Sequence, residues 1–297
     1  MSVIPRDQAA DLRQLMAARD FDDEPARVPS RRRTARVIAV ASGKGGVGKT
    51  SIAVNLAWRM SQSGHHVVLV DADLGTANVD LMLNVHPSHD LTSLLRDRRR
   101  VDDILLRVNS RFDLIAGASG IAGVADLSML DRRHLIEELG RLEERFDIIL
   151  IDCGAGISQN VMAFARAADD LILVTTPEPT AVTDAYALVK VLSRSEFVPE
   201  IGVVMNLANT EREGRQAAER LTAVASRFLK VDISVLGHIP RDEHVARAVR
   251  ERIPFVVQYP RSSASTCISA LADRIARPLD QECSDVGFFR RVFRFFH

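Results

Sequence analysis

Residues 36–280 show two patterns of apolar positions, one typical of strands and one typical of helices. The two patterns follow each other along the chain, so that they predict alternating strands and helices. Short continuous runs of valine, isoleucine and leucine are typical of parallel strands that are covered on both faces. Between most of these runs, apolar residues recur every three or four positions, as on the buried side of a helix. The expected strands are Val37–Ala41, His66–Asp71, Phe112–Ala116, Asp147–Asp152, Asp170–Thr176, Glu200–Asn206 and Val235–Ile239, and the expected helices include Arg132–Arg145, Val182–Arg194 and Arg212–Phe228.

This alternation predicts an α/β fold with a doubly wound, mostly parallel sheet and helices on both of its faces. Ligands of such sheets bind at the carboxyl ends of the strands. The ends of the chain have a different composition. We expect four segments: a helical segment at 1–24, a polar linker at 25–35, the α/β domain at 36–280 and an amphipathic helix within 281–297.

A glycine-rich loop follows the first expected strand. Residues 43–50 read Gly-Lys-Gly-Gly-Val-Gly-Lys-Thr and match the phosphate-binding pattern G-x-x-x-x-G-K-[ST] of P-loop NTPases. The glycines allow successive N–H groups to face phosphate oxygens, and the helix that follows adds positive potential. Lys49 is expected to reach the β- and γ-phosphates, and Thr50 to ligate Mg²⁺. The residues expected to bind the nucleotide are Gly43, Lys44, Gly45, Gly46, Val47, Gly48, Lys49, Thr50 and Ser51.

Two of the expected strands end in carboxylates. Asp71 and Asp73 end the second strand, and Asp152 ends another, just before a Cys-Gly-Ala-Gly loop. A carboxylate in this place can hold Mg²⁺ directly or through water, and the glycines beyond it can sense a γ-phosphate. Taken alone, each carboxylate is equally suited to capping a helix. Beside the phosphate-binding loop they predict a metal site made by Thr50, Asp71 and Asp152.

Lys44 is a second lysine in the loop, and a second cation so close to Lys49 needs a phosphate contact of its own. With it, the loop resembles the deviant Walker A motif K-G-G-x-G-K-T of MinD, ParA and the nitrogenase iron protein. The resemblance implies hydrolysis of ATP with Mg²⁺ by an ATP-bound homodimer, with Lys44 contacting the partner's nucleotide. An idle, solvated lysine is the alternative.

The same resemblance assigns roles to other residues. Asp73 matches the aspartate that orients the attacking water, so that Lys44, Lys49, Asp73 and Asp152 form the expected catalytic set. Asn206, Pro240 and Asp242 match the motifs on the adenine side, where an amide offers both a donor and an acceptor to the base. Without the resemblance, Asn206 is better interpreted as a turn residue.

The C-terminal sequence predicts an amphipathic helix. At roughly 100° per residue, its apolar side chains fall within about 160° of arc and its arginines fill the other side. This pattern is typical of a helix that lies in an anionic membrane interface. The alternative is a terminal helix that packs its phenylalanines on the core of its own protein. The expected membrane-binding residues are Phe288, Phe289, Val292, Phe293, Phe295 and Phe296 on the apolar side and Arg290, Arg291 and Arg294 on the cationic side.

The N-terminal segment narrows the resemblance. Asp7, Gln8, Ala9, Leu12 and Arg13 form the pattern D-Q-A-x-x-L-R, which resembles the start of the flagellar MinD-like ATPases called FlhG, FleN or YlxH. The resemblance implies that this segment stimulates an FlhF-type GTPase and that the chain controls flagellar number or placement. Flagellar switch-complex proteins or a flagellar transcription regulator are further partners that it implies. A frayed terminus without function is the alternative.

Composition sets limits on other functions. Lys plus Arg and Asp plus Glu both number 39, so no net charge favours nucleic acid, and Arg96 and Arg98–Arg100 form the main basic cluster after the linker. The three cysteines contain no C-x-x-C pair, which suits a reducing cytoplasm and argues against an iron–sulfur carrier. We expect a cytoplasmic protein that attaches reversibly to the inner face of the cytoplasmic membrane. A MinD-type division regulator and a ParA-type DNA or cargo partitioning ATPase remain the alternatives.

Overall fold

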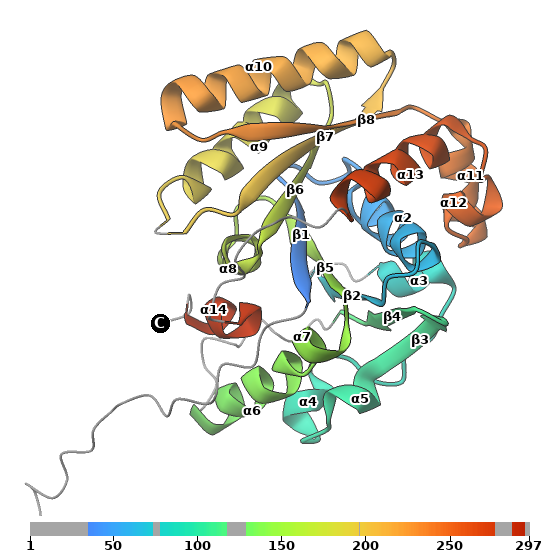
Figure 1. Ribbon diagram of the computed structural model, residues 1–297, viewed down its shortest axis with the longest axis vertical. Coiled ribbons are helices and arrows are strands. Elements are labelled where there is room, and N and C mark those ends of the chain that lie inside the picture. The colour runs from blue at the N-terminus through green and yellow to red at the C-terminus, as the bar shows by residue number, and fades with distance from the viewer. Residues whose placement is uncertain (1–34, 74–77, 118–128, 196, 277–286, 295–297) are drawn as a thin grey trace, which may run out of the picture. The chain divides into compact units, whose positions relative to one another are not determined.

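A single sheet organises the computed structural model, which describes residues 35–73, 78–117, 129–195, 197–276 and 287–294. Its eight strands lie in the order β3-β4-β2-β5-β1-β6-β7-β8 (Figure 1). All neighbouring strands are parallel except the pair of β3 and β4. The strands are β1 Arg36–Ser42, β2 Val67–Ala72, β3 Leu105–Asn109, β4 Phe112–Ile115, β5 Ile148–Ala155, β6 Asp170–Thr175, β7 Glu200–Ala208 and β8 Ile233–Pro240. The predicted doubly wound α/β fold is confirmed.

Helices cover both faces of this sheet (Figure 1). One buried cluster contains side chains of α6, α8, α9, α10 and α14, and the other contains those of α2, α11, α12 and α13. The helices are α2 Lys49–Gln62, α3 Val79–Leu83, α4 Ser93–Arg96, α5 Val101–Ile104, α6 Met129–Gly140, α7 Leu142–Arg145, α8 Gln159–Ala167, α9 Pro179–Leu192, α10 Glu211–Leu229, α11 Glu243–Glu251, α12 Phe255–Gln258, α13 Ser263–Ile275 and α14 Phe288–Arg294.

Two local features differ from the sequence prediction. Strand β3 was not predicted, because its residues are half-buried or exposed and lack the continuous apolar run of a central strand. The helix expected at Arg132–Arg145 is divided into α6 and α7 around Arg141. Among the described residues, no helix is long and apolar enough to span a membrane.

The edge strand β8 carries an unusual side-chain contact. The Arg274 guanidinium on α13 donates to the carbonyls of Val235, at 3.1 Å, and Leu236, at 2.5 Å. Unpaired carbonyls on an edge strand otherwise offer a template for another strand. Arg274 therefore occupies part of this edge.

The C-terminal helix α14 packs on the protein's own core in the single chain, and its binding to a membrane stays a prediction. The apolar side chains of its described part are buried against α6 and α8, and the Phe288 ring stacks on Phe164 of α8 with centroids 6.4 Å apart. The alternative of docking on the protein's own core is what the structure shows, since amphipathicity does not specify which surface covers the apolar side. Phe288, Phe289, Val292 and Phe293 are at most 5% exposed, Arg290 and Arg294 are exposed, and Phe295 and Phe296 lie outside the described residues.

Polar contacts hold α14 in this position. Arg291 pairs with Asp169 at 3.1 Å and lies over the Phe197 ring, while Glu143 accepts from the Phe289 N–H at 3.3 Å. Carboxylates near a helix N-terminus and guanidinium groups over aromatic rings are both stabilising. The helix is therefore held by its cationic side as well as by its phenylalanines.

We expect Phe288→Asp to release α14 without unfolding the sheet, because a carboxylate is strongly disfavoured in this apolar site. Native-state hydrogen exchange of residues 288–294 should then accelerate at least about tenfold, while exchange in β1 and β5 stays unchanged. Arg290→Ala, at an exposed position of the same helix, is the matched control and should exchange like the wild type. Equal protection of α14 in both variants would contradict this account of the docking.

Candidate functional site

The glycine-rich loop lies between β1 and the N-terminus of α2, as the sequence predicts. Gly46 and Gly48 have φ values of 77° and 89°, a region that side chains with a Cβ rarely adopt. Gly43 lies against the backbone of α9, where an added Cβ would come within 2.2 Å of the Asp184 carbonyl. No side chain caps the start of α2, so its first N–H groups remain available to a phosphate.

Strand register brings two carboxylates together at the rim of the sheet. Strand β5 lies between β1 and β2, and Asp152 pairs with Val40 on one side and with Asp71 on the other. The next residue of the rim, Asp73, donates its backbone N–H to Asp71 Oδ1 at 3.0 Å. The Asp73 carboxylate lies beside Gly154, so the three aspartates that the sequence selects share one site.

Lys49 is the cation of this site. Its Nζ lies 3.0 Å from Asp152 Oδ1, and the two side chains are 7% and 1% exposed. Burial raises the pKa of Asp152 above its ordinary value, while the Lys49 ammonium and the Thr50 hydroxyl oppose the increase. A buried carboxylate of this kind is held in place by its partner.

Two buried oxygens in the site have no hydrogen-bond partner among the described residues: Asp152 Oδ2 and Ser51 Oγ. Buried polar atoms without partners are uncommon in folded proteins. Thr50, Asp71 and Asp152 supply the hard oxygen donors that Mg²⁺ prefers, and Ser51 stands at the phosphate-facing end of α2. The residues present therefore fit the predicted nucleotide and its metal ion.

Asp71 is strongly perturbed. Burial, and after it the charge of Asp152, raise the pKa of its carboxyl to about 7, although N–H groups of Asp73 and Val79 lower it. Two close carboxylates in a poorly solvated place disfavour ionisation of both. A bound divalent cation would favour their ionised forms instead.

The second lysine of the loop is engaged by its own chain. Lys44 Nζ lies 3.2 Å from Glu178 Oε2 and 3.1 Å from Thr180 Oγ1, at the N-terminus of α9. Its side chain is 40% exposed, so this pair does not distinguish a lysine that serves a partner's nucleotide from the idle lysine of the alternative. Its contact with a partner's nucleotide remains a prediction. Glu178 was not predicted from the sequence, where its local signal is the N-cap position before Pro179.

The expected base-binding residues lie on the same rim. Asn206 is in β7 and not in a turn, and its Nδ2 donates to the Val47 carbonyl at 2.7 Å. Pro240 ends β8, and Asp242 caps α11 by accepting from the His244 N–H at 2.9 Å. Their contacts with adenine remain predictions. The N-terminal set, Asp7 to Arg13, lies outside the described residues.

The raised pKa of Asp71 predicts a pH dependence of stability in the absence of nucleotide and Mg²⁺. An unfolded aspartate loses its proton near pH 3.8, whereas the folded Asp71 keeps its proton up to about pH 7. The folded state then binds more protons, so the contribution of Asp71 to stability falls across this range and is level above it. The free energy of unfolding of Asp71→Asn, measured with urea, should rise relative to wild type between these pH values. A pH-independent difference would contradict the shift.

Comparison with known proteins agrees with this geometry. A family model described as an AAA domain matches residues 35–197, and one described as NUBPL iron-transfer P-loop NTPase matches residues 133–276. The antiactivator FleN of Pseudomonas aeruginosa is 39% identical over 240 residues, 81% of this chain and 86% of FleN. The flagellum site-determining protein YlxH of Helicobacter pylori is 32% identical over 270 residues, 88% and 90% of the two chains.

Solved structures give the same answer. The septum site-determining protein MinD of Pyrococcus horikoshii, in complex with Mg-ADP, matches with a TM-score of 0.69 and 28% identity over 82% of this chain and 96% of that one. The chain therefore belongs to the MinD-like P-loop ATPases and, within them, to the FleN and YlxH family, as its two-lysine loop, its three strand-end aspartates and these relatives show.

Proposed function

We propose that this chain is an ATP-driven switch that controls flagellar number or placement from the inner face of the cytoplasmic membrane. The flagellar assignment rests on one observation. That observation is the identity with FleN and YlxH, which extends over more than four fifths of the chain.

The reaction is hydrolysis of ATP to ADP and phosphate. Lys49 and the N–H groups at the start of α2 bind the phosphates, and Asp73 orients a water toward the γ-phosphorus. Water forms the new P–O bond as the bond to the β-phosphate oxygen breaks, and the ammonium of Lys49 compensates the developing charge. Bound Mg²⁺, held by Thr50 and Asp152 with support from Asp71, supplies further neutralisation of phosphate charge.

Lys44 links this reaction to dimerisation. In the single chain its ammonium is held by Glu178 and Thr180. This exposed ion pair is weak, since pairs of this kind contribute roughly 0–1 kcal/mol. A γ-phosphate on a second copy offers a stronger charge-assisted contact. If the Lys44 ammonium leaves Glu178 and binds the γ-phosphate of a second copy, the two copies are joined only while that ATP is intact.

Membrane attachment requires α14 to leave its buried position. Burial of each of its apolar side chains contributes about 1.5–3 kcal/mol, so release in water alone is unfavourable. Helix α14 packs on α8, which begins three residues after Gly156 in the loop beyond Asp152. A movement of that loop on ATP binding would therefore shift α8 and, through it, the packing of α14. A dimer presents two such helices, and this raises membrane avidity without new contacts.

The described residues do not favour the DNA-binding alternative. In the basic cluster, Arg98 pairs with Asp131, Arg99 with Asp97 and Arg100 with Asp102. Neutralised arginines form a poor surface for a phosphate backbone. The iron–sulfur alternative is not favoured either, because burial raises the pKa of both described thiols, that of Cys153 to about 12. A MinD-type division regulator remains the alternative that the experiments must separate.

The first experiment measures sedimentation of the full chain with phosphatidylglycerol vesicles. Wild type should bind with ATP and not with ADP, and Lys44→Ala should bind at least about tenfold more weakly because it loses the second helix of a dimer. Asp73→Ala should bind ATP but lose hydrolysis, and should therefore stay on the vesicles.

Deletion of residues 287–297 should abolish vesicle binding. Arg220→Ala, at an exposed position of α10, is the control. Vesicle binding by the truncated chain would refute the anchor, and normal turnover by Asp73→Ala would refute its role.

The second experiment tests the flagellar partner. GTP hydrolysis by the cognate FlhF-type protein should accelerate when a peptide of residues 1–24 is added, and Gln8→Ala in the peptide should remove the effect. A peptide with the same composition in scrambled order is the control. No stimulation by the intact peptide would leave a membrane-cycling MinD-like ATPase and favour division or cargo positioning.

A further inference from the structure

Three helices after β8 form a unit beside α2, which we call the helical bracket: α11, α12 and α13 (Figure 1). The first N–H groups of a helix have no partner within it and need one elsewhere. In the helical bracket, these partners come from side chains at the two ends of the nucleotide site. Asn55 serves α12, and Asp242 serves both α11 and α13.

Asn55 connects the bracket to the helix of the phosphate-binding loop. It lies in α2 and is fully buried, which is unusual for a polar side chain. Its Nδ2 donates to the Ser51 carbonyl at 2.7 Å, and its Oδ1 accepts from the Val256 N–H of α12 at 3.0 Å. The amide is thus satisfied at both ends, and Ser51 is next to Thr50 of the expected metal site.

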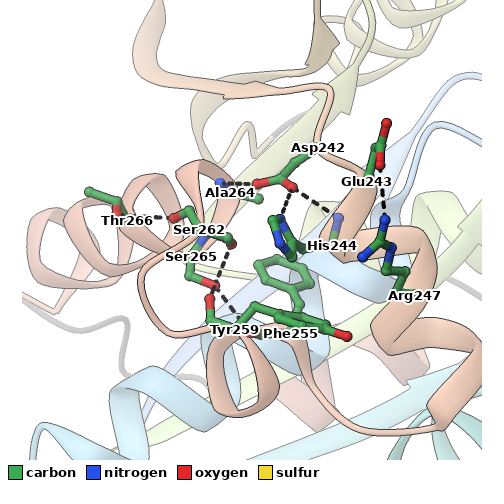
Figure 2. Close-up of polar contacts among 10 residues, drawn as sticks. All are labelled: Asp242, Glu243, His244, Arg247, Phe255, Tyr259, Ser262, Ala264, Ser265 and Thr266. Atoms are coloured by element: carbon green, nitrogen blue, oxygen red, sulfur yellow. Dashed lines mark hydrogen bonds and ion pairs between the residues drawn. The ribbon is translucent and has the colours of Figure 1, made fainter.

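Asp242 connects the bracket to the other end of the site. One of its oxygens accepts from the His244 N–H of α11 at 2.9 Å and contacts His244 Nδ1 at 2.8 Å. The other accepts from the Ala264 N–H of α13 at 3.1 Å (Figure 2). Burial alone would raise the pKa of Asp242, but these hydrogen bonds lower it. Both oxygens are therefore used by the protein itself.

Ser265 joins the helices of the bracket to one another. It is 1% exposed, and its Oγ donates to the carbonyls of Tyr259, at 2.7 Å, and Phe255, at 3.1 Å. The Tyr259 ring packs on His244 with centroids 4.7 Å apart (Figure 2). A continuous chain of contacts therefore runs from Ser51 to the rim residue Asp242.

We infer that Asn55 and Asp242 are positioning residues, which fix the spacing between the phosphate end and the base end of the nucleotide site through the helical bracket. Asp242 acts on the base through the loop that it shapes, because it holds the starts of α11 and α13 in place. The inference rests on the proposed binding of ATP. It assigns a role to Asn55, which lies outside the loop motif and follows none of the expected strands.

The test compares the affinities of ATP and inorganic tripolyphosphate, both with Mg²⁺, for the full chain by calorimetry. Tripolyphosphate needs only the phosphate end, whereas ATP needs the correct spacing. Asn55→Ala leaves the Val256 N–H of α12 without its acceptor. Asp242→Ser keeps a cap for α11 and is too short to reach Ala264. Each should weaken ATP about tenfold, as expected for one lost buried hydrogen bond, and change tripolyphosphate by less than about twofold.

Two further measurements complete the test. Asp273→Ala removes an exposed carboxylate of α13 and is the matched control, with unchanged affinities expected. The double variant should lose less affinity than the product of the single losses, because both substitutions act on one unit. Where Asp242→Ser fails to fold, Asp242→Asn keeps the shape of the side chain and one acceptor oxygen.

The opposite results are equally clear. Equal loss of ATP and tripolyphosphate, no loss of either, or strictly multiplicative losses in the double variant would each overturn the inference. Failure of the wild type to bind ATP would instead overturn the proposed function. That outcome is distinguishable, because it appears before any variant is compared.

Discussion

The register between β2, β5 and β1 is the constraint on which the site depends. Parallel pairing places Asp152 beside Asp71 at one depth of the rim, where neither carboxylate is well hydrated. Lys49 is the near cation that the described chain provides, and it offsets only part of the repulsion. The close approach of these two carboxylates is a consequence of strand register. A one-residue slip of β2 or β5 would turn one carboxylate to the opposite face of the sheet. The glycines of the loop, the Asn206 amide and Ser51 then surround a place that is prepared for a cation with phosphate oxygens.

Much of this arrangement was predictable, because the central strands and the phosphate-binding loop have strong local signals. A strand covered on both faces needs a continuous apolar run, and the loop needs glycine where φ is positive, so both leave a record in the sequence. Strand β3 leaves none, since it is a half-exposed edge strand. Asn55 and Glu178 were missed for a different reason: their partners, Val256 and Lys44, are distant along the chain. Only the fold brings such pairs together.

The C-terminal helix shows the limit of pattern analysis most directly. The apolar side of α14 is equally suited to lipid and to the surface offered by α6 and α8. Hydrophobic burial is not directional, so one sequence can serve both environments when their free energies are close. Arg291 illustrates the same point, because its guanidinium pairs with Asp169 in the folded chain and is equally suited to a lipid phosphate. The pattern was correctly identified as amphipathic, and its location depended on tertiary structure.

The guanidinium of Arg274 has a consequence for how copies of this protein can associate. By occupying the carbonyls of Val235 and Leu236, it makes this part of the edge strand β8 a poor template for backbone pairing with another molecule. Growth of the sheet from one molecule into the next, which would be continuous and hard to reverse, is discouraged on this side. Association is thereby directed to surfaces whose contacts are made by side chains and ligands. Contacts through a ligand are lost when the ligand is consumed, which suits the proposed cycle of association and separation without formation of fibres.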